Sequence, residues 1–187
     1  CEKTIALADR GCFHASVQTE DFYIGTRVKA LEMKCCVSKG VLIFIATIVN
    51  QETFKYSYGR NCTAGVENVR IKLPVKHNDD GIIFIDDEHT YSDEGYVPDW
   101  QFMENYIKSL HYKPLTTEKK KGHSNELRVE KWKWFSLKEI SNVYTGDDLI
   151  LSMVDDGEIP VASHKVENNG VGAMVDKIDN RQLFDCE

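Results

Sequence analysis

The sequence lacks several features that would place the chain in a specialised class of protein. Its 187 residues include only 4 prolines and 12 glycines, which excludes a collagen-like or low-complexity chain. The longest apolar run, residues 41–49, is far shorter than the roughly 20 residues that cross a bilayer as a helix. Because 42% of the residues are apolar, the chain can bury a core and is not expected to be disordered. We therefore expect a soluble globular protein that does not contact a membrane.

The six cysteines lack the spacing of a metal site or of an ordinary disulfide framework. None belongs to a Cys-x-x-Cys pair, and Cys35 is followed directly by Cys36. A chain with a large core does not need disulfides for stability, and thiols stay reduced in the cytoplasm. We therefore predict free cysteines and a cytoplasmic protein.

Common catalytic signatures are also missing. The sequence contains no nucleophile elbow, glycine-rich phosphate loop or dinucleotide fingerprint. One enzymatic alternative remains, because Asp99 followed by Glu118 and Lys120 matches the loose pattern of Mg²⁺-dependent nucleases. In that pattern carboxylates hold the ion and a lysine orients the attacking water. Asp99 is better explained as a helix cap and Glu118 lies in a polar segment, so we predict no catalytic residue, metal ligand or cofactor.

Charge is distributed unevenly along the chain, although the formal net charge is −7. Residues 1–80 and 113–140 are net positive, whereas residues 81–112 and 141–187 are net negative. Two of these four segments would therefore attract a polyanion that the whole molecule repels. Nucleic-acid binding without sequence preference is not expected, because it depends on many phosphate contacts.

The pattern of apolar residues predicts an α+β fold with a mixed, mostly β core. Residues 38–51 could form a strand or a buried helix, and we predict a helix because Ser38 is a good N-cap. Asn169-Gly170 between two extended segments predicts a hairpin. Trp132 and Trp134 are expected to pack in the core. The expected strands are residues 3–8, 22–33, 69–74 and 132–136, with a polar loop at 9–16 and a short helix at 137–140.

The clearest helix begins at Asp99, which can cap it, and it is expected to protrude. Residues 114–125 after it are polar and are interpreted as a flexible linker. The apolar side chains of the helix recur at helical spacing and form one stripe: Trp100, Met103, Ile107 and Leu110.

Two groups of segments resemble the two halves of one known domain, in swapped order. One group is residues 132–140, 157–163 and 168–171, and the other is residues 5–11, 22–33, 54–60 and 69–74. They look like the first and second halves, respectively, of a target-recognition domain. Such domains belong to the DNA-specificity (S) subunits of type I and type IIB restriction–modification systems. The helix that begins at Pro98 is similar to the conserved-region helix that follows such a domain.

The resemblance implies a domain organisation with four parts. Residues 1–97 would be the second half, 98–112 the spacer helix, 113–127 the linker, and 128–187 the first half, which completes the same fold. The pair Cys-Glu at both ends of the sequence fits a circular permutation. A fragment that spans two tandem domains, or half-subunits that complete each other, would give the same order. In every case we expect the two termini to lie close together.

The resemblance also implies a non-catalytic protein that recognises one half of a split site in double-stranded DNA. Methyl transfer and cleavage would belong to partner modification and restriction subunits, which the helix stripe would dock. That helix would also pair with a second target-recognition domain or a second copy. An alternative is a module that only binds other proteins through this helix.

Sequence readout needs hydrogen-bonding side chains on loops that reach base edges. Three polar loops carry such side chains and are expected to converge on one face. The expected DNA-binding residues are Arg10, His14, Ser16 and Gln18 on the first loop, Tyr58, Arg60 and Asn61 on the second, and His164, Lys165, Asn168 and Asn169 on the third.

Overall fold

The computed structural model describes residues 2–56, 60–62, 65–110, 127–147, 149–150 and 153–184. The fold is α+β with more strand than helix, as the sequence predicts. Most of the predicted linker and Tyr58 lie outside the described residues. The helices and strands are β1 (Glu2–Ala8), β2 (His14–Val17), β3 (Tyr23–Ile24), β4 (Val28–Val37), α1 (Lys39–Gln51), β5 (Arg70–Leu73), α2 (Trp100–Leu110), β6 (Lys133–Ser136), α3 (Leu137–Ile140), β7 (Ser141–Thr145), β8 (Asp156–Ala162) and β9 (Val171–Val175).

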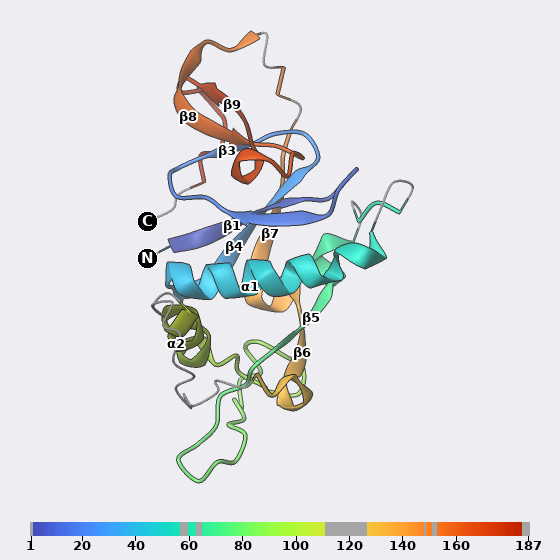
Figure 1. Ribbon diagram of the computed structural model, residues 1–187, viewed down its shortest axis with the longest axis vertical. Helices are drawn as coiled ribbons and strands as arrows, with labels where there is room; N and C mark the ends of the chain where they lie inside the picture. Colours follow the sequence, from blue (N-terminus) through green and yellow to red (C-terminus); the bar gives the residue numbers. More distant parts are fainter. Residues whose placement is uncertain are drawn as a thin grey trace, which may run out of the picture.

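Each of the three sheets joins strands that precede α2 with strands that follow it. The largest has the order β2-β1-β4-β7, the second β3-β8-β9, and the third pairs β5 with β6. The β3–β8 pair is parallel, and the other pairs are antiparallel. Phe184 forms an isolated antiparallel β-bridge with Phe22, and it packs in the same hydrophobic cluster as Ala6 of β1. The two ends of the described chain therefore lie close together, as Figure 1 shows.

Helix α1 forms at residues 39–51, which confirms the prediction for the ambiguous apolar run. The Ser38 hydroxyl oxygen accepts a hydrogen bond from the Val41 amide at 3.4 Å and caps the helix. Figure 1 shows α1 crossing the middle of the molecule, with the β1–β4 layer on one side and α2 on the other. This double coverage explains why the run is apolar nearly all round, with Val41, Leu42, Phe44, Ile45, Ala46 and Val49 all buried.

Helix α2 begins as predicted, because the Asp99 carboxylate accepts a hydrogen bond from the Phe102 amide at 2.9 Å. Its apolar stripe, however, is covered by the chain itself. Met103 is fully buried and Ile107 is 8% exposed, and the helix packs against α1. Of the four stripe residues, only Leu110 is well exposed, at 58%. The interface expected on this stripe stays a prediction.

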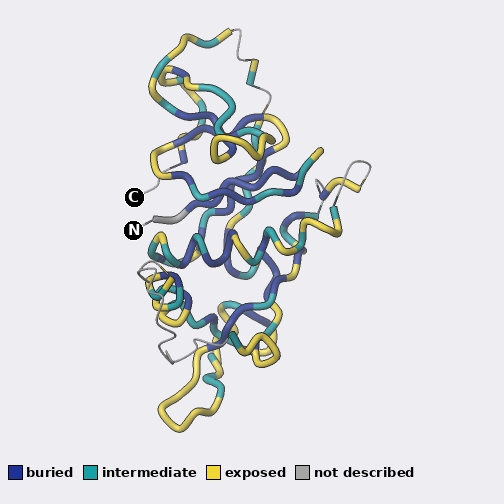
Figure 2. The backbone as a smooth tube through the Cα atoms, in the orientation of Figure 1, coloured by how far each residue is buried: buried dark blue, intermediate teal, exposed yellow. Residues whose placement is uncertain are grey.

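The connection from β5 to α2 runs away from the core. Figure 2 shows this connection largely exposed, whereas β1, β4 and α1 are mainly buried. Isolated bridges link its two arms, including His77 with Ile83 and Ile85 with Tyr96. None of the helices in the described part of the chain is long and apolar enough to cross a membrane.

Several local expectations need correction. The predicted loop at 9–16 contains strand β2, which pairs with β1. The predicted strand at 22–33 is broken at Gly25, because the chain there leaves the sheet of β3 and enters that of β4. Backbones cross closely at this break, since a Cβ atom on Gly146 would lie 2.2 Å from the Gly25 carbonyl oxygen.

The cysteines and tryptophans also differ in part from expectation. Cys12, Cys35 and Cys62 are free as predicted, but Cys36 is disulfide-bonded. Trp132 is buried, whereas Trp134 is 41% exposed. The strand begins only after Trp132, so strand alternation does not place the two rings on one face.

Candidate nucleic-acid interface

The first and third predicted loops lie against each other through side-chain amides. The Gln18 amide donates a hydrogen bond to the Asn169 carbonyl oxygen at 2.9 Å. In return, the Asn169 amide donates to the Val17 carbonyl oxygen at 2.8 Å. Gly170 allows this approach, because a Cβ atom there would lie 3.1 Å from the Ser16 hydroxyl oxygen, and its φ is +80°. Two segments about 150 residues apart in sequence thus form one surface.

The second loop joins the same surface at the turn between β1 and β2. The Gly11 amide donates a hydrogen bond to the Asn61 side-chain oxygen at 3.3 Å. On the other side of this turn, the Cys12 thiol donates to the His164 carbonyl oxygen at 2.8 Å. Burial raises the pKa of the Cys12 thiol, so it stays protonated and able to donate. The convergence of the three loops is therefore present in the described residues.

Exposure divides the described members of the predicted DNA-binding set into three groups. Ser16 and Gln18 are only 7% and 3% exposed, so their side chains support the loops and do not reach solvent. Gln18 donates a second hydrogen bond, to the Ser16 hydroxyl oxygen at 3.0 Å, which explains this burial. His14 is half-buried. The exposed members are Arg10, Arg60, Asn61, His164, Lys165, Asn168 and Asn169.

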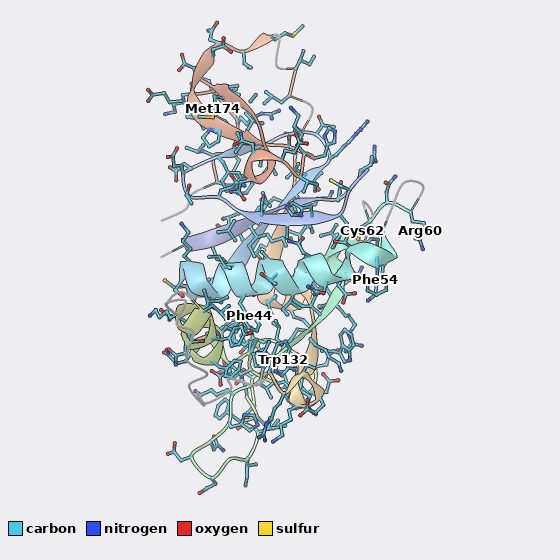
Figure 3. The ribbon with its side chains drawn as sticks, viewed as in Figure 1. Phe44, Phe54, Arg60, Cys62, Trp132 and Met174 are labelled. Carbon is cyan, nitrogen blue, oxygen red and sulfur yellow. The ribbon has the colours of Figure 1, made fainter. Side chains whose placement is uncertain are left out.

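Arg60 is an exposed residue of the second loop. Figure 3 shows Arg60 further from the body of the molecule than Cys62. Cys62 itself is 6% exposed, and its amide donates to the Asp9 carbonyl oxygen at 3.1 Å. The buried end of this segment is therefore attached to the β1–β2 turn while Arg60 stays exposed.

The His14 ring lies at the edge of the surface and is electrostatically neutral near pH 7. Burial lowers the pKa of His14 below its ordinary value, because the charged imidazolium is poorly solvated there. His14 can therefore offer a hydrogen bond to DNA, but not a positive charge to a phosphate.

A buried ion pair lies beneath the loops. The Lys29 ammonium is 3.5 Å from the Asp9 carboxylate, with the two side chains 8% and 1% exposed. Lys29 also donates to the Thr145 hydroxyl oxygen at 2.8 Å. Within the described chain the Asp9 carboxylate oxygens have no hydrogen-bond partner, so Lys29 is their main stabilising neighbour.

Tyr56 and Cys62 fill the space next to this pair. Burial, together with a hydrogen bond with the Cys62 thiol, raises the pKa of Tyr56 to about 12. Burial also raises the pKa of Cys62. Both groups are therefore neutral at physiological pH, so the buried charge here comes from Asp9 and Lys29.

Sequence reasoning missed Arg27, which adjoins the candidate interface. Its carbonyl oxygen accepts a hydrogen bond from the Asp9 amide at 3.1 Å, and its side chain is exposed. Its φ is +69°, a conformation that arginine rarely adopts. Strained backbone of this kind is often found at functional sites. No local sequence signal indicates this arginine, because its backbone conformation arises where the chain passes from the sheet of β3 to the sheet of β4.

A metal centre has no support in the described residues. There, no group of three or more histidine, cysteine, aspartate or glutamate side chains is placed to share an ion. In the acidic connection after β5, hydrogen bonds from Thr90 and from the Glu88 amide lower the pKa of Asp86, so that carboxylate closes a turn. The nuclease alternative also lacks support: Asp99 caps α2, and Glu118 and Lys120 lie outside the described residues.

The chain was compared with protein families, curated proteins and solved structures, and one of these comparisons finds a match. No protein-family model and no solved structure matches the chain. Over 162 residues the chain is 27% identical to the specificity subunit S.BcgI of a type II restriction enzyme from Heyndrickxia coagulans. The chain is thus similar in sequence to a restriction-enzyme specificity subunit. The match covers 83% of this chain and 42% of S.BcgI, so the chain spans less than half the length of this relative. This match supports the resemblance to specificity subunits, whereas the swapped order of the two halves stays a prediction.

Proposed function

We propose that this chain recognises a DNA sequence as part of a restriction–modification specificity subunit of type I or type IIB. The homology to S.BcgI supports the functional class. The observation that carries the proposal is the convergence of three polar loops, with Arg10, Lys165 and Asn168 exposed on the same surface.

These side chains suit base recognition in the major groove. Arginine and lysine donate to the two acceptors of guanine, and asparagine pairs with the donor and acceptor of adenine. The exposed set contains Arg10, Arg60, Lys165 and Asn168, so it could contact either kind of base pair. The buried amide of Gln18 and the Asp9–Lys29 pair would hold the loops in place, which lowers the entropy lost on binding.

The proposed protein is non-catalytic and acts with partner subunits. Partner modification and restriction subunits would methylate or cleave the DNA that this chain selects. We propose the exposed side of α2, with Phe102 at 37% and Leu110 at 58% exposure, as the surface that docks such a subunit or a second recognition domain. This surface lies on the same helix as Met103 and Ile107, which are buried. The same surface is compatible with the alternative function, a module that binds only proteins. The DNA-selection experiment below distinguishes the two functions.

We further propose that residues 1–97 and 128–187 are the two halves of one recognition domain, joined by the spacer helix at 98–112 and a linker at 113–127. The support is that every sheet takes strands from both halves. A protease site inserted between residues 113 and 126 tests this arrangement. The nicked chain is expected to remain one particle in size-exclusion chromatography, and separation of the halves without denaturant would refute the proposal.

The decisive experiment is selection of bound duplexes from a random pool, in the presence of a modification subunit. Enrichment of one short motif is expected. A matched variant, Lys165→Ala/Asn168→Ala, should weaken that enrichment, whereas Lys177→Ala, exposed elsewhere, should not. If the wild-type chain enriches no motif, the recognition proposal is wrong, and binding of the modification subunit alone would favour the protein-interaction alternative.

A further inference from the structure

A second polar surface lies beside the candidate interface, along the last strand of the largest sheet. Strand β7 pairs with β4 on one edge, and no other strand of the described chain pairs with its second edge. A cleft of about 570 Å³ opens over β7. Three lysines line it, Lys29 from β4, Lys34 from β4 and Lys138 from α3, and β7 contributes Asn142 and Thr145.

Basic side chains outnumber acidic ones in the lining of this cleft, although the protein as a whole is acidic. Glu67 is the one acidic residue among those that line it in the described chain, against three lysines. Lys29 is already paired with Asp9. Lys34 and Lys138 have exposed side chains, and neither forms an ion pair within the described residues. These two ammonium groups are therefore available to an anion.

Lys29 links the cleft to the base of the three loops. Lys29 lines the cleft and also contacts Asp9, the residue before exposed Arg10. Thr145 lines the cleft and accepts the hydrogen bond from Lys29 at 2.8 Å. The cleft and the base of the loops therefore share Lys29, which places them next to each other.

We propose that this cleft binds the phosphodiester backbone of the duplex whose bases the loops contact, which rests on the proposed function. Lys34 and Lys138 would each donate charge-assisted hydrogen bonds to phosphate oxygens, and the Asn142 amide and Thr145 hydroxyl would donate neutral ones. Contacts of this kind set the register of a protein on DNA without reading its sequence. A strand from another protein is the competing occupant of the open β7 edge, but lysines beside an edge oppose such pairing.

Salt dependence of binding tests this inference with the full chain. The probe is a short mixed-sequence duplex, and its affinity is measured by fluorescence anisotropy between roughly 50 and 200 mM salt. Lys34→Gln/Lys138→Gln is expected to reduce the slope of log affinity against log salt by about 2, since each phosphate contact contributes about 0.9. The matched control is Lys39→Gln/Lys177→Gln, which removes the same charge from exposed positions outside the cleft and should change the slope far less.

Outcomes separate this inference from the proposed function. If the cleft variant and the control have the same slope, or if wild type does not bind the duplex at the lowest salt, the cleft is not a phosphate site. An unchanged slope with new self-association of the cleft variant would mean that the lysines only protect the β7 edge, which also overturns the inference. If the slope falls as expected but selection from a random pool gives no motif, the cleft stands and the recognition proposal fails.

Discussion

Gln18 donates a hydrogen bond to the carbonyl oxygen of Asn169, a residue 151 positions later in the chain. The donor is buried and the acceptor belongs to an exposed residue, so a support residue holds a candidate contact residue directly. The candidate interface thus contains buried residues that hold the loops in place and exposed residues that can contact a ligand. This division also defines which substitutions should affect folding and which should affect only binding.

Replacing Gln18 should destabilise the loop contact and the fold together. Gln18→Ala leaves the Ser16 hydroxyl and the Asn169 carbonyl without their donor, so the free energy of unfolding should fall by about 1 to 3 kcal/mol in a urea titration. Gln101→Ala is a suitable control, because Gln101 is exposed on α2, and it should change the free energy by no more than about 0.5 kcal/mol. Equal effects of the two substitutions would contradict a structural role for Gln18.

Substitution of Arg27 should separate backbone strain from DNA contact. Because φ is +69°, Arg27→Gly should be more stable than Arg27→Ala by about 1 kcal/mol. If the exposed side chain contacts DNA, both variants should bind the selected duplex more weakly than wild type does. Weakening that is uniform across sequences would indicate a phosphate contact, and loss of preference at one position a base contact. Unchanged affinity in both variants would exclude Arg27 from the interface.

Removing one partner of the buried Asp9–Lys29 pair should lower the free energy of unfolding more than removing both partners. Lys29→Met leaves the Asp9 carboxylate buried without its cation and should cost about 3 to 5 kcal/mol of unfolding free energy. Asp9→Asn/Lys29→Met should recover much of that loss, since neither charge remains. Thermal or urea unfolding of the single and double variants measures the coupling. A double variant that is less stable than Lys29→Met would rule out this electrostatic explanation.

Two apolar residues on α2 should respond differently to truncation. Met103→Ala removes a fully buried side chain and should cost about 2 to 5 kcal/mol of unfolding free energy. Leu110→Ala, at an exposed position, should cost no more than about 0.5 kcal/mol but should weaken capture of a modification subunit. Pull-down with that subunit and urea unfolding together test the assignment. Normal capture by Leu110→Ala protein would remove Leu110 from the proposed docking surface.

Stability should fall in mild acid partly because of His14. Its pKa is lowered in the folded protein, so the unfolded chain binds a proton first as pH falls through about 6.5. The neutral ring therefore stabilises the fold above that pH, and this contribution is lost below it. His14→Gln should lose less unfolding free energy than wild type between about pH 7.5 and pH 5. Identical losses in the two proteins would show that His14 does not titrate differently on folding.

The sequence by itself determined the elements that depend on neighbouring residues. The side chains of Ser38 and Asp99 cap α1 and α2. Each accepts a hydrogen bond from the amide three positions later, so the sequence pattern is enough to predict the cap. The Asn169-Gly170 turn forms because both residues adopt positive φ, at 52° and 80°. The three polar loops could be named as candidates for the same local reason, since their polar side chains lie between apolar segments.

Tertiary structure alone decided which of those side chains are buried and which partners they have. Ser16 and Gln18 look like exposed loop residues until the segment at 163–170 covers them. From the sequence alone, Met103 could lie on an exposed helix face, but in the structure it is buried. Arg27 adopts a positive φ at the point where the chain passes from one sheet to another. Strand pairing and burial depend on contacts between residues that are distant in sequence, and the period of a local apolar pattern contains no information about such partners.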